Sequence, residues 1–303
     1  MQYYFPNYPD ISIEKTIAID LGTTNTTAVV VRHDKVEAIE IDGDSRLLRS
    51  VVSYRKTGIL VGQAAINCAR TSLLTVENIK RIAGLSYQEA MEFERTYFGC
   101  SIEHQGDMVL LKRSDDDDAD YSKTVEEVIT DIFSSIKKIV EEKLCAEFKY
   151  LVLTVPSTYT SKQKGAIRKA AEQAGFCVAS MLMEPTAAGI HYHNIGLIDK
   201  KSVFLIFDFG GGTLDLSLVQ HDHNKFAVLS TGGSPHLGGN DINSALLGCV
   251  KRRYLEDHQS QLQLRGLRER KLMEAIERAK IELQSSQTSI IEVDGNRRAI
   301  CLS

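Results

Sequence analysis

The chain lacks the features of membrane, secreted and nucleic-acid-binding proteins. No apolar run of about 18 residues is present, so we expect no segment to span a membrane. Residues 1–15 have no basic start and no apolar segment, which argues against a signal peptide. Six scattered cysteines without a C-x-x-C pair argue against a disulfide framework or a zinc site and fit the reducing cytoplasm. A net charge of −4 gives no basic surface for nucleic acid.

Two common phosphate-binding patterns are also missing, because neither G-x-x-x-x-G-K-[ST] nor G-x-G-x-x-G occurs. The chain instead contains another design twice. In the first copy, a β-branched strand at 16–20 ends in Asp20, and a turn containing Gly22, Thr23 and Thr24 leads into a strand at 26–31. In the second copy, a strand from 203 runs into Asp208, three glycines and Thr213, and 214–219 continue as a strand.

The two turns have the composition of phosphate-binding hairpins. Glycine has no Cβ and tolerates positive φ, so its backbone amides can approach an anion such as a phosphate. Asp208 and Asp215 flank the second turn, where a carboxylate pair can hold hydrated Mg²⁺. Either turn alone is equally well explained as an ordinary glycine-rich hairpin. Two copies imply two similar lobes facing one nucleotide, as in actin-like ATPase folds.

Other segments narrow the comparison to one family. IDLGTTN, NIKRIAG, TVPSTYTSKQKGAIRKAAEQAGF, MEPTAAGI, FDFGGGTLDLSL, HLGGNDIN and ERAKIEL follow one another between residues 19 and 283. In this order and at these spacings they resemble the nucleotide-binding domain of the seventy-kilodalton heat-shock chaperones, over roughly residues 16–295. With 43% hydrophobic residues, a chain of 303 residues is long enough to form two lobes with separate cores.

The resemblance implies an α/β, actin-like ATPase fold with two lobes, each built on a mixed sheet with flanking helices, and a nucleotide in the cleft between them. Residues 1–15 would form an N-terminal extension. Lobe I would span 16–195, with inner part 16–49 and 127–195 and outer part 50–126. Lobe II would span 196–303, with inner part 196–237 and outer part 238–303.

The resemblance also implies a site for ATP or ADP with Mg²⁺. Metal-binding residues would be Asp20, Asp208 and Asp215, and catalytic residues would be Lys80, Glu184, Asp208 and Thr213. The nucleotide would be contacted by Gly22, Thr23, Thr24, Asn25, Gly210, Gly211, Gly212, Thr213, Gly238, Gly239, Glu277, Lys280, Ile281 and Gln284. Without the resemblance, Lys80 is a solvated lysine on a surface helix, and Glu184 is a first-turn charge that complements the helix dipole.

The sequence departs from the family at the adenine pocket and at its end. Ile281 stands where the family commonly has an arginine that stacks on adenine, and Gln284 stands where it has a serine. Loss of the stacking contact, worth about 0.5–2 kcal/mol, predicts an affinity for ATP that is about two- to thirtyfold lower. No G-G-[ST]-R-x-P loop occurs, so we expect a second lobe without its returning inner segment, with apolar surface exposed on its sheet.

The predicted function is slow ATP hydrolysis by a chaperone domain that couples nucleotide state to protein-substrate binding. The resemblance implies J-domain co-chaperones and nucleotide exchange factors as partners, and unfolded clients bound through a substrate-binding domain that this sequence does not contain. We expect neither nucleic acid nor a membrane as a partner. The alternatives are a nucleotide-binding module with little or no hydrolysis, and a metabolite kinase of the same fold.

Four local expectations concern individual residues. The H-x-H pairs at 191–193 and 221–223 lack a third metal ligand and indicate surface histidines. Asn240 is a candidate N-cap for a helix over 241–254, with Ile242 facing inward. Gly232 and Gly233 indicate a turn. The aspartate run at 115–118 indicates an exposed loop.

Overall fold

The computed structural model describes residues 11–93, 100–113, 121–223, 225–264, 267–293 and 298–302. The first ten residues of the predicted extension, the aspartate run at 115–118 and the Asp-Gly pair at 294–295, whose sequence predicts a turn, lie outside these ranges. The described residues form two compact units. The first contains Met1–Gly210 and Asp215–Gly233, and the second contains Gly211–Leu214 and Ser234–Ser303.

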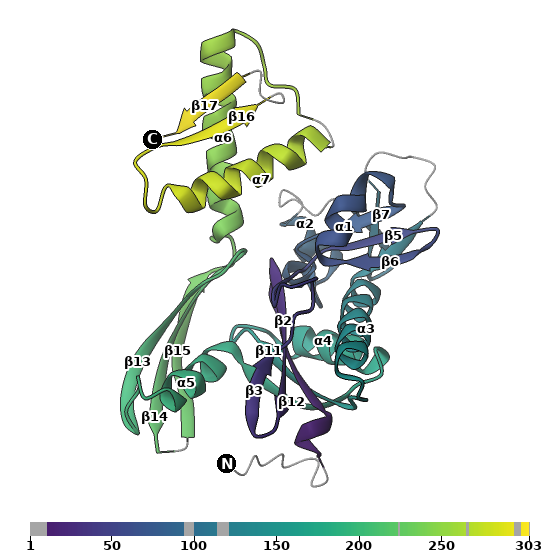
Figure 1. Cartoon of the computed structure of the whole chain (residues 1–303), viewed down its shortest axis with the longest axis vertical. Helices are drawn as coiled ribbons and strands as arrows, with labels where there is room; N and C mark the ends of the chain where they lie inside the picture. Colours follow the sequence, from purple (N-terminus) through teal and green to yellow (C-terminus); the bar gives the residue numbers. More distant parts are fainter. Residues whose placement is uncertain are drawn as a thin grey trace. The chain divides into compact units, whose positions relative to one another are not determined.

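The first unit is built on a six-stranded mixed sheet in the order β12-β11-β1-β2-β3, with β4 paired to β2 (Figure 1). β1 pairs in parallel with β11 and antiparallel with β2, so the first half of the hairpin design is a central strand. The bounds of these strands are β1 Thr16–Leu21, β2 Asn25–Arg32, β3 Lys35–Ala38, β4 Leu48–Arg49, β11 Tyr150–Val155 and β12 Cys177–Met183.

Two long helices accompany this sheet, α3 (Val125–Leu144) and α4 (Ser161–Gln173). The buried apolar side chains of α3 recur at three- and four-residue spacings, which is the pattern of an amphipathic helix. Each helix begins with a capping box, in which Thr124 and Thr160 accept a hydrogen bond from the third helical N–H. These side-chain hydrogen bonds therefore fix the N-terminus of each of the two helices.

Smaller elements form the outer part of the first unit. One three-stranded sheet has the order β6-β5-β7 and another has the order β10-β9-β8. The elements are β5 Val52–Arg55, β6 Gly58–Val61, α1 Gly62–Cys68, η2 Ala69–Thr71, β7 Leu74–Val76, η3 Ile79–Ile82, α2 Tyr87–Met91, β8 Ser101–Gln105, β9 Met108–Lys112 and β10 Ser122–Thr124; η1, Ile13–Lys15, precedes β1.

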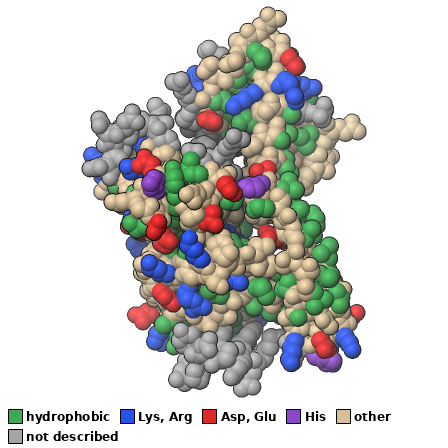
Figure 2. All heavy atoms as spheres, turned by 180° about the vertical axis from the view of Figure 1, so that it is seen from behind, with side chains coloured by type: hydrophobic (Ala, Val, Ile, Leu, Met, Phe, Trp, Pro, Cys, Tyr) green, Lys and Arg blue, Asp and Glu red, His purple; other side chains and the backbone are tan. Residues whose placement is uncertain are grey.

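A separate antiparallel sheet contains β13 (Lys201–Phe209), β14 (Leu214–Asp222) and β15 (Lys225–Ser234), and α5 (Glu184–Asn194) packs on it. The alternate side chains Val203, Leu205 and Phe207 of β13 are 57–64% exposed. Figure 2 shows hydrophobic side chains gathered over this part of the molecule. The exposed apolar surface expected from the sequence is therefore present on this sheet. The predicted turn at Gly232–Gly233 is wrong, because both residues continue β15.

The prediction of surface histidines is wrong for His221. Its side chain is fully buried, and its ring stacks on that of Phe226 with centroids 4.2 Å apart. Both ring nitrogens lie within hydrogen-bonding distance of carbonyl oxygens, Nδ1 at 2.7 Å from Asp199 O and Nε2 at 2.5 Å from His223 O. The alternation of β14 turns this residue toward the covered face of the sheet, which the local H-x-H pattern does not reveal.

The second unit packs α6 (Gly239–His258) and α7 (Leu267–Glu282) with the hairpin of β16 (Ser289–Val293) and β17 (Arg298–Leu302). Its small core includes Val250, Tyr254, Ile276, Ile291 and Ile300. Two helix predictions are wrong here: α6 starts at Gly239, so Asn240 lies inside the first turn, and Ile242 is 37% exposed. The N-cap position belongs to Gly238, whose N–H donates to the Asp241 carboxylate at 2.8 Å.

Within the described ranges, no helix is both long and apolar enough to cross a membrane. None of the six cysteines, which all lie in the described ranges, forms a disulfide.

Candidate functional site

The first glycine turn joins β1 to β2 and is anchored by Ser50. The Ser50 hydroxyl donates to the Gly22 carbonyl oxygen at 2.8 Å, and the Ser50 N–H donates to the Thr24 carbonyl oxygen at 2.9 Å. Only glycine fits at position 22, because a Cβ there would collide with the Asn25 carbonyl oxygen. The Thr24 hydroxyl is buried and has no hydrogen-bond partner in the described part of the chain. Because buried hydroxyl groups are normally hydrogen-bonded, this one favours a ligand that brings an oxygen acceptor to the turn.

Lys80 forms a buried ion pair close to the end of β1, the strand that leads into the first glycine turn. It lies in the 3₁₀ helix η3, and its Nζ is 2.6 Å from Oε1 of Glu184, the first residue of α5. The two side chains are only 11% and 16% exposed, and the Tyr159 hydroxyl donates to the Lys80 carbonyl oxygen at 2.7 Å. The interpretation of Lys80 as a solvated lysine on a surface helix is therefore wrong. Glu184 does lie in the first turn of α5, but its carboxylate accepts a hydrogen bond from the Lys80 ammonium.

Carboxylates from strand ends lie close enough to this pair to shift its pKa values. Burial raises the pKa of Glu184, with Asp20 and Asp208 adding to the increase and Lys80 opposing it. Burial also raises the pKa of Asp208, helped by repulsion from Asp215 and Asp20. Acidic groups thus crowd around one positive side chain, and an added cation would relieve their repulsion.

The charge of Lys80 is secured by the same neighbours. Burial alone would lower the pKa of Lys80, but the attraction of Glu184, Tyr159 and Asp20 outweighs burial and raises the pKa above its ordinary value. Burial raises the pKa of Tyr159 to about 12, so its hydroxyl remains a donor at neutral pH. The site therefore holds a permanent ammonium beside a group of carboxylates.

The second glycine turn packs on the start of α6. The Asn240 N–H donates to the Gly211 carbonyl oxygen at 2.8 Å. A Cβ at position 238 would lie 2.6 Å from the Gly212 carbonyl carbon, which is too close for any side chain. Gly238 is thus required for close backbone packing of this turn, which the sequence pattern alone did not show.

A polar group links α6 to α7 in the second unit. Glu277 accepts hydrogen bonds from Asn243 Nδ2 at 2.6 Å and from Lys280 Nζ at 2.7 Å, and Lys280 also donates to the Gly239 carbonyl oxygen at 3.3 Å. Asn243 is buried, and its Oδ1 has no hydrogen-bond partner in the described part of the unit. The predicted residues Gly239, Glu277 and Lys280 are therefore brought together. Asn243 was not predicted, although it ends the HLGGNDIN segment.

The predicted adenine contacts lie on the surface of the second unit. Ile281 is 56% exposed and Gln284 is exposed, with the Gln284 N–H donating to the Ile281 carbonyl oxygen at 3.2 Å. Neither side chain packs in the apolar core of the second unit. Both are therefore available to a ligand.

The comparisons with known proteins agree on one family. The family model for Hsp70 protein matches residues 16–296. The chain belongs to the Hsp70 family. It is 32% identical over 280 residues to the chaperone protein DnaK of Ureaplasma parvum serovar 3, covering 92% of this chain and 42% of that protein. It is 33% identical to the DnaK of Psychrobacter cryohalolentis and 32% identical to the heat shock 70 kDa protein of Neurospora crassa, covering 92% of this chain and 43% of each.

Membership of the Hsp70 family confirms the resemblance found in the sequence and the α/β, actin-like ATPase fold class. It also makes nucleotide binding the property expected of this domain. The chain spans less than half the length of the curated relatives named above.

Asp208 and its neighbours Asp20 and Asp215 supply carboxylate oxygens, the kind of donor that Mg²⁺ takes. No three acidic, histidine or cysteine side chains among the described residues are grouped closely enough to hold an ion directly. Mg²⁺ usually keeps several waters and is held by one or two carboxylates together with phosphates. Burial raises the pKa of Asp208 and repulsion from Asp215 and Asp20 adds to the increase, so a cation beside these carboxylates would relieve part of the repulsion.

Two further residues of the site were not predicted as contacts. The Thr154 hydroxyl donates to Asp20 Oδ1 at 2.6 Å, and Tyr159 supports the backbone of Lys80. Both lie in the TVPSTYT segment that carried the resemblance. The parallel pairing of β1 with β11 places Thr154 beside Asp20, so strand pairing was the signal that could have identified it.

Proposed function

We propose that this chain binds ATP or ADP and hydrolyses ATP slowly, as the nucleotide-binding part of an Hsp70-type chaperone. The observation that supports this proposal most strongly is the buried Lys80–Glu184 pair, which lies among strand-end carboxylates next to a glycine turn with a free buried hydroxyl. Such a site can neutralise developing negative charge with a fixed ammonium.

The proposed phosphate contacts are the residues of the two glycine turns, Gly22, Thr23, Thr24, Asn25, Gly210, Gly211, Gly212 and Thr213. Backbone amides of Gly22 and of the second turn would bind phosphate oxygens, and the free Thr24 hydroxyl would donate to one of them. Asp20, Asp208 and Asp215 would hold Mg²⁺ through its waters, and the ion would neutralise phosphate charge.

Lys80 has the central catalytic role in this proposal. Its ammonium would bind the oxygens of the transferring phosphoryl group more strongly as their charge develops, which lowers the barrier to hydrolysis. Glu184 keeps Lys80 in place and, together with Asp208, would orient the attacking water. Thr213 would complete the set from the second glycine turn. None of these groups is a strong base at neutral pH, so turnover would be slow.

The adenosine would be bound by the second unit. Glu277 and Lys280 would contact the ribose, with Asn243 holding Glu277 in position, and Gly238 and Gly239 would approach through their backbone. Ile281 and Gln284 would contact the base. Because Ile281 supplies an apolar surface in place of a stacking cation, binding would be weaker and less selective for adenine.

Membership of the Hsp70 family also suggests which partner proteins to propose. DnaK and the heat shock 70 kDa protein are much longer than this chain. We therefore propose J-domain co-chaperones, nucleotide exchange factors and unfolded proteins as partners of an assembly in which this domain takes part. The six free cysteines support a reducing, cytoplasmic location.

Single-turnover release of phosphate from ATP with Mg²⁺ tests the proposal. We expect slow release that needs no second substrate. Turnover that depends on an added sugar or acid would instead identify a metabolite kinase of the same fold. Binding of ATP without any phosphate release above the buffer rate would identify a nucleotide-binding module, and hydrolysis would be excluded.

A further inference from the structure

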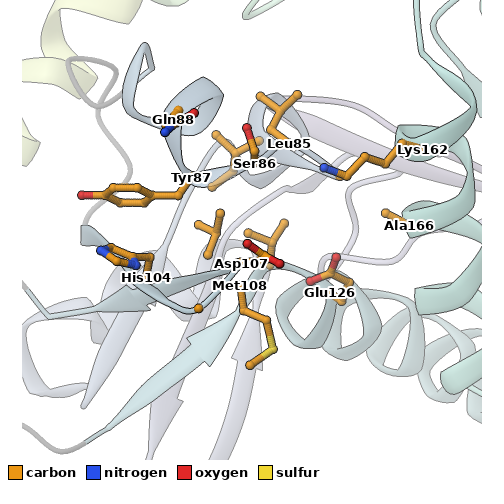
Figure 3. Close-up of a pocket in the computed structure, with 15 residues that line it drawn as sticks. Leu85, Ser86, Tyr87, Gln88, His104, Asp107, Met108, Glu126, Lys162 and Ala166 are labelled. Carbon is orange, nitrogen blue, oxygen red and sulfur yellow. The ribbon is translucent and has the colours of Figure 1, made fainter.

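A hollow of about 780 Å³ lies in the first unit, and none of its lining residues is among those assigned to the nucleotide (Figure 3). Its walls come from the loop that begins α2, from the tip of the β8–β9 hairpin and from the first turns of α3 and α4. The lining residues used below are Leu85, Tyr87, His104, Asp107, Glu126 and Lys162. The volume is in the range that accommodates a small ligand or a partner's side chain.

The walls of this hollow are fixed by local interactions. Gly84 has φ of +69°, and a Cβ there would lie 2.7 Å from the Cα of Gln163, so the loop packs tightly on the first turn of α4. Ser86 caps α2 with a capping box. The capping boxes of α3 and α4 hold the other two helix starts. The hollow is therefore preformed, so little binding free energy would be spent on ordering its walls when a ligand binds.

Two acidic side chains face this space without forming an ion pair with a described residue. Asp107 and Glu126 point into the hollow from the hairpin tip and from α3 (Figure 3). Neither carboxylate makes a hydrogen bond or an ion pair with any described residue. The one basic side chain, Lys162, enters from the opposite wall, beside Ser86. Its charge acts on Glu89, whose pKa is lowered mainly by the hydrogen bonds from Ser86 and further by Lys162.

An aromatic pair lies across the hollow from Glu126, with Asp107 between them (Figure 3). The ring centroids of Tyr87 and His104 are 4.5 Å apart, and the rings are tilted by 41°. Leu85 adds an apolar wall. A flat cation can stack on an aromatic face while its N–H groups bind a carboxylate, and the guanidinium group of arginine does both because it is planar and weakly hydrated. The methylene groups of the same side chain would contact the apolar wall.

We propose that this hollow is a docking pocket for an arginine side chain presented by a peptide segment of a partner protein. Its guanidinium stacks on the aromatic pair of Tyr87 and His104 and pairs with Asp107, while the charge of Glu126 on the far side of the hollow adds to the attraction. The charge complementarity of two unpaired carboxylates, together with the aromatic pair, favours arginine over lysine, over neutral residues and over acidic residues. None of the pocket's lining residues is assigned to the nucleotide, although Ile82 of its wall lies in η3 together with Lys80.

Titration of the full-length, isotopically labelled chain with acetyl-Gly-Arg-Gly-amide, followed by NMR, tests this proposal. We expect chemical-shift changes at Tyr87, His104 and Gly106, with a dissociation constant of about 1 mM. The matched peptides carry citrulline, which has the same shape without the charge, or lysine. Both are expected to bind at least about threefold more weakly.

Three variants complete the experiment. Asp107→Asn and Glu126→Gln should each weaken binding of the arginine peptide by about two- to fivefold. Glu147→Gln removes an exposed carboxylate beyond the opposite end of α3 and should leave the affinity unchanged. The proposal is overturned if the arginine peptide causes no shifts in the pocket, if citrulline or lysine binds equally well, or if both pocket variants bind normally while their spectra show a folded chain.

Discussion

Lys80 is the residue on which the proposed chemistry depends. If its ammonium acts mainly in the transition state, Lys80→Ala should slow single-turnover hydrolysis by about 100-fold or more and change ATP affinity by only a few-fold. Lys138→Ala, which removes an exposed lysine from α3, is the matched control and should leave both values unchanged. Equal losses of rate and affinity would show that Lys80 is an ordinary phosphate anchor.

Asp208 should make the ligand-free protein less stable at neutral pH. Its pKa is raised in the folded state, so the folded protein binds its proton more tightly than the unfolded chain does. The free energy of unfolding therefore falls as pH rises from the ordinary aspartate pKa into the raised range. We expect Asp208→Asn to raise the melting temperature at pH 7 by about 1–3 °C, after allowance for solvent screening of this partly exposed group.

The gain from Asp208→Asn should disappear below the ordinary pKa range of aspartate, where the wild-type carboxyl is neutral. Asp44→Asn, at an exposed turn outside the cluster, should show no such pH dependence. A wild-type-like melting temperature for Asp208→Asn at every pH would contradict the raised pKa.

Ile281 tests the proposed adenine contact. Since its side chain is 56% exposed, a larger residue can be placed there without disturbing the core of the second unit. Ile281→Arg should restore a stacking cation and improve ATP affinity by up to about tenfold in calorimetric titration. An unchanged or weaker affinity would show that the base binds elsewhere.

At the scale of elements, the second glycine turn and the start of α6 act as one packed piece of backbone. Gly238→Ala would place a Cβ 2.6 Å from the Gly212 carbonyl carbon, so the turn must shift. We expect a loss of about 1–3 kcal/mol in the stability of the second unit, measured by hydrogen exchange, and weaker ATP binding.

Gly248→Ala in the same helix is the matched control for Gly238→Ala. Nothing lies within 4 Å of a Cβ at position 248, so the substitution should stabilise α6 by about 0.5–1 kcal/mol. Equal effects of the two substitutions would contradict the packing role of Gly238.

The sequence predicted the elements better than their environments. The β-branched run at 16–20 identified β1, and the apolar periodicity of 125–144 is enough to indicate α3, because both signals are local. Burial of Lys80 and His221 was not predicted, since it results from contacts with distant segments such as Glu184 and Asp199. The second strand of the last hairpin, β17, was also missed, because its pairing with β16 sets its structure more than its own short sequence does.

At the scale of the whole molecule, the two units differ greatly in the size of their cores. The first contains a large cluster on one face of its central strands, whereas the core of the second has eight buried apolar residues among those the structure describes. A small core supplies less stabilisation, so the second unit should open first and unfolding should not be two-state.

Limited trypsin digestion followed by mass spectrometry checks this difference. Early cleavage should occur in the second unit, at Lys251, Arg252 or Arg253 of α6, and leave a resistant fragment that begins near residue 16. The lobe boundary at residue 195, which stays a prediction, would be supported by a fragment ending there. A single cooperative transition together with resistance of α6 would contradict unequal stability.

Calorimetric titration of the chain with ATP and with ADP, each with and without Mg²⁺, tests the central claim most directly. We predict one nucleotide per chain, Mg²⁺-dependent binding and loss of that dependence in Asp208→Asn, because the strand-end carboxylates hold the hydrated ion beside the phosphates. No heat of binding up to millimolar ATP, with a folded chain, would contradict the account.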